Sequence, residues 1–160
     1  MTRWLDEDEQ RAWRALLAMV EALQSGLDAQ LQADSAMPHG YYELLVRLSE
    51  APDRSLRMSA FAEASRSSRS RLSHAVGQLE QRGWVRRETC ASDRRGQVAV
   101  LTDAGFAALE QAAPGHVAAV RELLLDRLTP LQVRQLCTIG EAVTGCSAQR
   151  AEPLDRQRLA

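Results

Sequence analysis

Two arginines, Arg94 and Arg95, are the side chains whose chemistry this sequence indicates most directly. They lie in the stretch SDRRGQVAVLT, residues 92–102, between Asp93 and Gly96. The second half of the stretch alternates apolar and polar residues, as a β-strand does. We therefore expect the arginines at the tip of a β-hairpin, where Gly96 permits the turn back into the strand. Because guanidinium groups bind phosphate oxygens through several hydrogen bonds, this tip predicts contact with something negatively charged.

The charges of the chain are segregated although their total is close to zero. The net formal charge of the 160 residues is −1, and the twenty basic residues are all arginine. Residues 1–53 carry a net charge of −6, residues 54–95 carry +6 and residues 96–160 carry −1. A strongly basic middle third between acidic flanks indicates an anion-binding module.

A helix predicted over residues 68–82 supplies a second surface suited to such contacts. If Leu72, Val76 and Leu79 point inward, a rotation of about 100° per residue turns the opposite face to solvent. Hydroxyl, guanidinium, imidazole and amide groups on that side can donate hydrogen bonds to base edges and phosphates. Gly83 is expected to stop the helix. The candidate DNA contacts of this helix are Ser68, Arg69, Ser70, Arg71, Ser73, His74 and Gln78.

The elements predicted around this helix follow a recognisable order along the chain. A short helix capped by Ser59 is expected before it, and a strand over WVRRETC with a partner at residues 97–102 after it. A helix, a turn, a second helix and a hairpin make a winged helix-turn-helix. With the second helix in a major groove, Arg94, Arg95 and Gly96 of the wing would reach the adjacent minor groove. Asp93 repels phosphate, so we expect it to support the wing by pairing with Arg87 or Arg94.

Further helices are predicted on both sides of this unit. Apolar residues at helical spacing indicate a long helix over residues 5–33 and a second over 40–50. A third is expected from 103 to 128, capped by Thr102 and interrupted at Pro114-Gly115, and a fourth from 130 to 145, capped by Thr129. The predicted fold class is mainly α with a small β-hairpin wing. Residues 38–102 form the winged helix-turn-helix domain and residues 147–160 a flexible tail.

Other classes of protein find little support in the sequence. There is no glycine-rich phosphate loop, no Ser-His-Asp ordering and no spacing typical of a metal site, so we expect no enzymatic activity, cofactor or metal. No apolar run reaches the length of about 20 residues that a membrane span needs. The three cysteines are too few and too scattered for a disulfide framework, which favours a reducing, cytoplasmic setting.

Residues 71–105 resemble the MarR family of bacterial transcription regulators. The matching features are Arg82-Gly83 at the end of a leucine-rich helix, the strand Trp84-Val85-Arg86-Arg87, the wing Asp93-Arg94-Arg95 and the helix entry Leu101-Thr102-Asp103-Ala104-Gly105. The order of helices extends the resemblance to about residues 5–146. It implies a regulator that binds a palindromic operator on double-stranded DNA, acts as a repressor, and is released by a small aromatic or phenolic ligand.

The resemblance also implies a homodimer and a ligand site. The helices over 5–33 and 103–146 would form the dimerisation region, and they carry more leucine than one small domain readily buries. Half-sites on the DNA would then lie about 34–36 Å apart, one helical turn. Ligand-binding candidates between the two regions are Trp13, His39 and Tyr42, since an apolar cleft with a few polar groups suits such a ligand.

Two alternatives stay open on the sequence alone. Cys90 lies among arginines, which lower the pKa of a thiol, so the chain is alternatively a thiol-based redox-responsive regulator of the same fold. A winged helix can also serve as a protein-interaction module without DNA. The operator sequence, the regulated genes and the identity of an effector are not readable from the residues.

Overall fold

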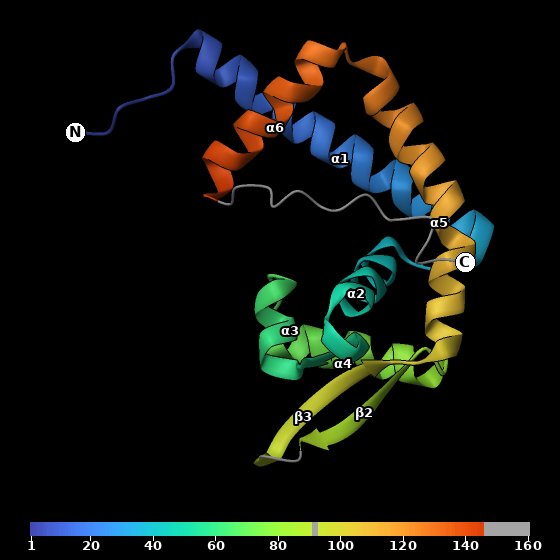
Figure 1. Cartoon of the computed structure of the whole chain (residues 1–160). Helices are drawn as coiled ribbons and strands as arrows, with labels where there is room; N and C mark the ends of the chain where they lie inside the picture. Colours follow the sequence, from blue (N-terminus) through green and yellow to red (C-terminus); the bar gives the residue numbers. More distant parts are fainter. Residues whose placement is uncertain (91–92, 146–160) are drawn as a thin grey trace. The chain divides into compact units, whose positions relative to one another are not determined.

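The computed structural model describes residues 1–90 and 93–145, with the side chains of all of these except residues 90 and 93–95 (Figure 1). Six α-helices, two short 3-10 helices and three strands follow one another in this part of the chain. In chain order they are α1 (Glu7–Ser35), α2 (His39–Glu50), η1 (Pro52–Arg54), β1 (Ser55–Arg57), α3 (Met58–Ala64), α4 (Arg69–Gln81), β2 (Val85–Cys90), β3 (Asp93–Leu101), α5 (Asp103–Leu123), η2 (Leu125–Arg127) and α6 (Pro130–Thr144).

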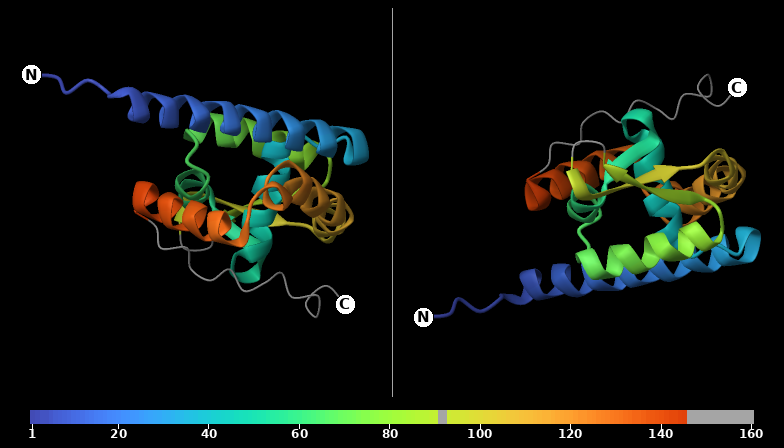
Figure 2. Two further views of the ribbon diagram at one scale, coloured as in Figure 1. Left: turned by 90° about the horizontal axis from the view of Figure 1, so that it is seen from above. Right: turned by 90° about the horizontal axis from the view of Figure 1, so that it is seen from below.

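The chain divides into two compact units. One comprises Met1–Gly26 and Val117–Ala160, and the other comprises Leu27–His116. The helices α1 and α5 each begin in one unit and end in the other. Figure 2 shows α1 as one continuous rod. Within the described part of the chain, no helix combines the length and apolar character of a membrane span.

The unit Leu27–His116 has the winged helix-turn-helix fold that the sequence predicted. Its sheet is antiparallel in the order β1-β3-β2, and Figure 1 shows the β2–β3 hairpin extending away from helices α2–α4. The inner stripe of α4 is confirmed, since Leu72, Val76 and Leu79 are buried. They pack in one core with residues of α2, α3 and the sheet, such as Leu45 and Phe61.

The end of α4 is set by Gly83, as expected. Gly83 has a φ of 71°, which a side chain would disfavour, and its N–H donates to the carbonyl of Glu80. The N–H of Trp84 donates to the carbonyl of Leu79, which completes a Schellman motif. This motif leads the chain from α4, the helix predicted to contact DNA and called the recognition helix from here on, directly into the first wing strand.

The entry to α5 is fixed by Thr102 and Gly105. The Thr102 hydroxyl donates to the carbonyl of Gly83 at 2.6 Å and accepts from the N–H of Gly105 at 3.0 Å, so it caps α5 and ties it to the end of α4. A Cβ at Gly105 would lie 2.1 Å from the carbonyl oxygen of Trp84. The Leu-Thr-x-x-Gly pattern is therefore explained by one cap and one close approach of two backbones.

The structure corrects several local expectations. The sequence predicted no strand before α3, but Ser55–Arg57 form a third strand, β1. Helix α3 begins at Met58, so Ser59 lies inside it and is not its cap. The strand β3 begins at Asp93, so Gly96 lies within the strand and not at the turn. Helix α5 is not broken at Pro114, although it ends at Leu123 before a 3-10 turn.

The unit formed by residues 1–26 and 117–145 has a different character. None of its described side chains is buried, and every buried apolar side chain of the described residues lies between Leu31 and Ala112. Trp13, Leu16 and Ile139 remain 52%, 44% and 60% exposed. Helix α6 is nevertheless well terminated, with a capping box between Thr129 and Gln132 and with left-handed Gly145 at its end.

The close approach at Gly105 yields a stability prediction. Gly105→Ala should lower the free energy of unfolding by about 1–3 kcal/mol, because a methyl group has to push the backbone of Trp84 away. Gly40→Ala is the matched control, since nothing lies within 4 Å of its added Cβ. Urea denaturation followed by circular dichroism measures both. Equal stability of the two variants would contradict the close contact.

Candidate nucleic-acid interface

The recognition helix α4 presents most of its predicted contact residues to solvent. Ser68, Arg69, Ser70, Arg71, Ser73 and His74 are exposed, and Gln78 is half-buried. Ser68 has an additional structural role, because its hydroxyl accepts from the N–H of Arg71 and caps the helix. The guanidinium groups of Arg69 and Arg71 have no carboxylate within 4.0 Å among the described residues.

The wing is tied to this helix by Arg87 on β2. Its Nη2 donates to the carbonyl of Ser73 at 2.6 Å, and its backbone N–H donates to Oε1 of Glu80 at 3.1 Å. Its Nε lies 3.2 Å from Oε2 of Glu80, an ion pair without the geometry of a hydrogen bond. Arg87 and Glu80 are 22% and 33% exposed, so the pair is partly shielded from water. These three contacts fix the angle between the wing and the recognition helix.

Several side chains near the tip of the wing are not described by the structure. The side chains of Asp93, Arg94 and Arg95 are not among those described, so the expected contacts of Asp93 stay a prediction. The carboxylate that the structure places beside Arg87 is Glu80. The backbone register is irregular here: Thr89 pairs with Gln97, whereas Cys90 pairs with Asp93. The extra residues on β3 form a bulge at the end of the wing.

A polar cleft lies between the recognition helix, the β1–α3 junction and the outer half of strand β3. It has a volume of about 420 Å³ and includes the predicted residues Arg69, Ser73 and Gly96. It also includes Arg57, Ser59 and Gln97, which the sequence did not indicate as contact residues; Met58 completes the lining. Arg57 is placed there because β1 pairs with β3, with Arg57 opposite Val98. The only signal in the sequence was the membership of Arg57 in the basic segment 54–95.

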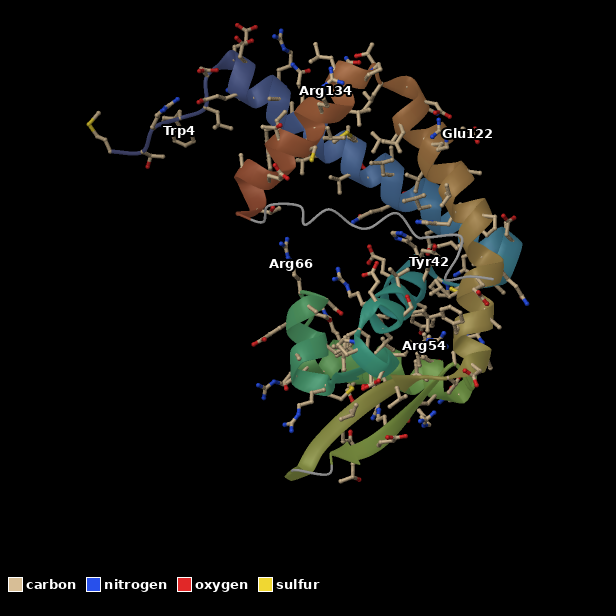
Figure 3. The ribbon with its side chains drawn as sticks, in the orientation of Figure 1. Trp4, Tyr42, Arg54, Arg66, Glu122 and Arg134 are labelled. Atoms are coloured by element: carbon tan, nitrogen blue, oxygen red, sulfur yellow. The ribbon has the colours of Figure 1, made fainter. Side chains whose placement is uncertain are left out.

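The predicted ligand residues are partly brought together. His39 and Tyr42 line a cavity of about 300 Å³ together with Glu43, Val46, Arg47, Glu50 and His116. The ring of His116 lies 5.6 Å from that of His39 and 4.3 Å from that of Tyr42, on the side of α2 where Figure 3 labels Tyr42. Trp13 belongs to the other unit, where it lines an apolar groove.

Burial changes the acid–base chemistry of this cavity. It raises the pKa of Tyr42, which keeps the phenol protonated near neutral pH. It also lowers the pKa of His116, helped by the nearby His39 and opposed by Glu43. The Nδ1 atom of His116 is buried without a hydrogen-bond partner. The sequence did not indicate His116, since it lies far from His39 along the chain.

The described residues form no arrangement that supports metal binding or thiol chemistry. No group of three or more histidine, cysteine or acidic side chains is placed there to hold a metal ion. Cys137 is an exposed free thiol on α6. The side chain of Cys90, the residue on which a redox-responsive regulator would depend, lies outside the described residues.

An exposed recognition helix, a wing fixed to it and a polar cleft between them define the winged helix class of DNA-binding domain. Comparison with known proteins identifies the family within this class. A family model described as "MarR family" matches residues 37–96. The chain is 52% identical to Sco3205 of Streptomyces coelicolor, a MarR family transcriptional regulator solved in complex with DNA, with a TM-score of 0.87 and 90% of each chain covered.

A second relative supports the same family, and a more distant structure shares the fold. AbsC, another MarR family transcriptional regulator of Streptomyces coelicolor, is 42% identical, with a TM-score of 0.82, 91% of this chain and 100% of AbsC covered. A MarR mutant of E. coli complexed with operator DNA is 20% identical and shares the fold, with a TM-score of 0.76 and 87% and 99% coverage. No curated protein gives a significant match. The chain belongs to the MarR family of transcriptional regulators.

The contacts of Arg87 with Ser73 and Glu80, which we call the clamp between wing and helix, yield a second prediction. Glu80→Gln removes the charge beside Arg87 and should cost about 1–2 kcal/mol of stability, between the values for surface and buried pairs. Glu88→Gln is the control, because Glu88 pairs with Arg86 at 2.6 Å where both are exposed, and it should cost less. Amide hydrogen exchange should show faster opening of β2 in the Glu80 variant alone. Equal exchange in both variants would contradict a role of the clamp in holding the wing.

The lowered pKa of His116 predicts how stability depends on pH. The unfolded chain takes up its proton near pH 6.5, whereas the folded chain does so only at lower pH. The contribution of His116 is therefore full above pH 6.5 and is lost as the pH falls from 6.5 through the lowered pKa. His116→Asn should flatten this part of the profile of unfolding free energy against pH. A profile identical to that of the parent would contradict the prediction.

Proposed function

We propose that this regulator binds double-stranded DNA as a homodimer, represses transcription from a palindromic operator, and is released by a small aromatic or phenolic ligand. The observation that carries the DNA-binding part is the fixed pairing of an exposed, arginine- and serine-rich recognition helix with a wing through Arg87. The similarity to Sco3205, which was solved with DNA, supports the same interpretation. In this proposal α4 enters a major groove and the wing reaches the adjacent minor groove.

The homodimer is supported by the exposed apolar surface of the unit 1–26 and 117–145. A groove of about 610 Å³ on this unit is lined almost entirely by apolar side chains of α1 and α6 and of the segment before α1. Large exposed apolar patches rimmed by polar residues mark protein interfaces. A second copy of the chain presents the same surface, so a two-fold dimer would cover both grooves at once.

The ligand site we propose is the cavity of His39, Tyr42 and His116. Its two imidazoles and protonated phenol can hydrogen-bond a phenolic hydroxyl or carboxylate, and the aromatic rings supply apolar contact. The buried Nδ1 of His116, which has no partner, would gain one on binding. The role of Trp13, which belongs to the other unit, stays a prediction from the sequence.

The central experiment selects bound fragments from the parent genome and measures their affinity in gel-shift titrations at several salt concentrations. Affinity for a selected fragment should fall steeply as salt rises, because each phosphate contact releases a counterion. A winged-helix protein-interaction module would select no fragment, and that outcome would contradict the proposal. Phenolic compounds are then screened for release of the selected fragment.

Arg95→Ala should weaken binding to the selected fragment by about 1–3 kcal/mol, the value of one good groove contact. The reason is the loss of one guanidinium group from the wing. Arg134→Ala is the matched control, since it removes the same charge from α6 and should leave the affinity within about 0.5 kcal/mol. An unchanged affinity of the Arg95 variant at fixed salt would remove the wing from the mechanism.

Ile139→Glu should convert the dimer into a monomer, because it buries a charge in the apolar interface of α1 and α6. Sedimentation velocity measures the change. Gln135→Glu adds the same charge to α6 at an exposed position outside the groove and should stay dimeric. A parent chain that sediments as a monomer would contradict the homodimer outright.

A further inference from the structure

Two arginines of the basic segment 54–95 make contacts inside the unit Leu27–His116, which we call the winged unit. The chain passes from this unit to the other one twice, once within α1 and once within α5. Arg82 contacts the residue that follows α1, and Arg54 contacts the beginning of α5. Within the winged unit, an arginine side chain thus lies at the end of each helix that continues into the other unit.

Arg82 joins the end of the recognition helix to the end of α1. It follows the last residue of α4, and its Nη1 donates to the carbonyl of Ala36 at 3.0 Å. Ala36 has a φ of 48°, in the left-handed region that residues with a side chain seldom adopt. Its N–H donates to the carbonyl of Gln32 at 3.1 Å, so Ala36 stays attached to the last turn of α1. The carbonyl that accepts from Arg82 is thereby held in a fixed direction.

The same guanidinium group lies over two aromatic rings. Its central carbon is 4.9 Å from the centroid of the Trp84 ring and 5.8 Å from that of the Tyr41 ring. A cation within about 6 Å of a ring face is attracted by the quadrupole of the ring. Trp84 leads into β2 and Tyr41 lies in the first turn of α2, so the side chain of Arg82 connects α1, α2, α4 and β2. A planar guanidinium group suits this role better than an ammonium group, because it can stack on a ring and donate in its own plane at the same time.

Arg54 joins β1 to the beginning of α5 in a similar way. Its guanidinium carbon is 3.7 Å from the centroid of the Phe106 ring, and its Nη1 lies 3.6 Å from Oδ1 of Asp103. Asp103 is fully exposed, so the ring contact is the stronger of the two. The backbone of Asp53 and Arg54 is left-handed, with φ of 52° and 50°. Two such residues in a row cost free energy, and the contact with Phe106 helps to keep this turn in place.

These contacts separate the arginines of the basic segment by role. The guanidinium groups of Arg69 and Arg71 lie on the exposed recognition helix and have no carboxylate within 4.0 Å among the described residues. Those of Arg54 and Arg82 are engaged with aromatic rings and with protein oxygens instead. Charge alone would assign all four side chains to DNA, whereas their partners within the protein set Arg54 and Arg82 apart.

We propose that Arg82 and Arg54 are positioning residues, which hold the recognition helix and the wing sheet on the ends of α1 and α5 without contacting DNA. The consequence for DNA binding rests on the proposed function. A homodimer on a palindrome has to present two winged units at one spacing, so a loosened attachment weakens binding to the whole palindrome. A single half-site engages one winged unit, so its binding does not depend on the attachment.

The attachment itself is tested without DNA, by amide hydrogen exchange of the full chain. Arg82→Gln should speed exchange about tenfold at the amides of Ala36 and Trp84, because a hydrogen bond and two ring contacts are lost. Arg82→Lys should restore part of the protection, since it keeps the charge. Arg86→Gln is the matched control, because Arg86 pairs with Glu88 where both are exposed, and it should change exchange at these amides less than about twofold.

Arg54→Gln should give the corresponding change at the amides of Ser55 and Phe106. Thermal unfolding of each variant confirms that it is folded. Exchange that is unchanged in both Arg82→Gln and Arg54→Gln would overturn the proposal. An equal change at Ala36 and Trp84 in the Arg86 variant would overturn it as well, because the loss would then follow from charge and not from the attachment.

Gel-shift titrations then separate positioning from contact. Arg82→Gln should raise the dissociation constant for the selected palindromic fragment about tenfold, and that for an isolated half-site less than about twofold. Arg71→Gln, which removes a proposed DNA contact, should weaken binding to both fragments. An equal loss on both fragments in the Arg82 variant would make Arg82 a DNA contact, and no loss on either would leave it without a role; both results overturn the proposal. If the parent chain selects no fragment, the proposed function fails, and hydrogen exchange alone decides whether the attachment exists.

Discussion

The contact on which the DNA-facing surface depends is that of Arg87 with the recognition helix. A hairpin of two strands is marginal by itself, and its direction in space is set by what it packs against. Arg87 reaches the carbonyl of Ser73 with its guanidinium group and the carboxylate of Glu80 with its backbone N–H and its charge. Because these partners lie about two turns apart along α4, the contacts fix both the position and the angle of the wing. In the proposed DNA complex, a helix and a wing that moved independently could not match two grooves of the same duplex.

The two units differ in how much of their apolar surface they bury. Residues 27–116 bury a complete core and hold their own sheet and helices together. The described residues of the other unit bury no side chain fully and leave tryptophan, leucine and isoleucine exposed along α1 and α6. Such a surface is costly in water, which supports the proposed homodimer. In the proposed dimer, assembly and folding of that unit would be one process.

The helix α2 separates two cavities with different chemistry. On one side the imidazoles of His39 and His116 meet the protonated phenol of Tyr42, and on the other side Arg47 and Arg71 face an apolar wall. Arg47 and Glu43 line both spaces.

The sequence by itself determined what depends on neighbours within about one helical turn. The stripe of Leu72, Val76 and Leu79, the stop at Gly83 and the caps at Thr102 and Thr129 all rest on contacts between residues close in the chain. The tertiary structure alone decided what distant residues do together. Strand β1 forms because three residues pair with β3 more than forty positions later, and His116 joins His39 across a larger gap. Local sequence patterns do not indicate such pairings. The free energy of the pairings comes from burial and strand register, which exist only in the folded chain.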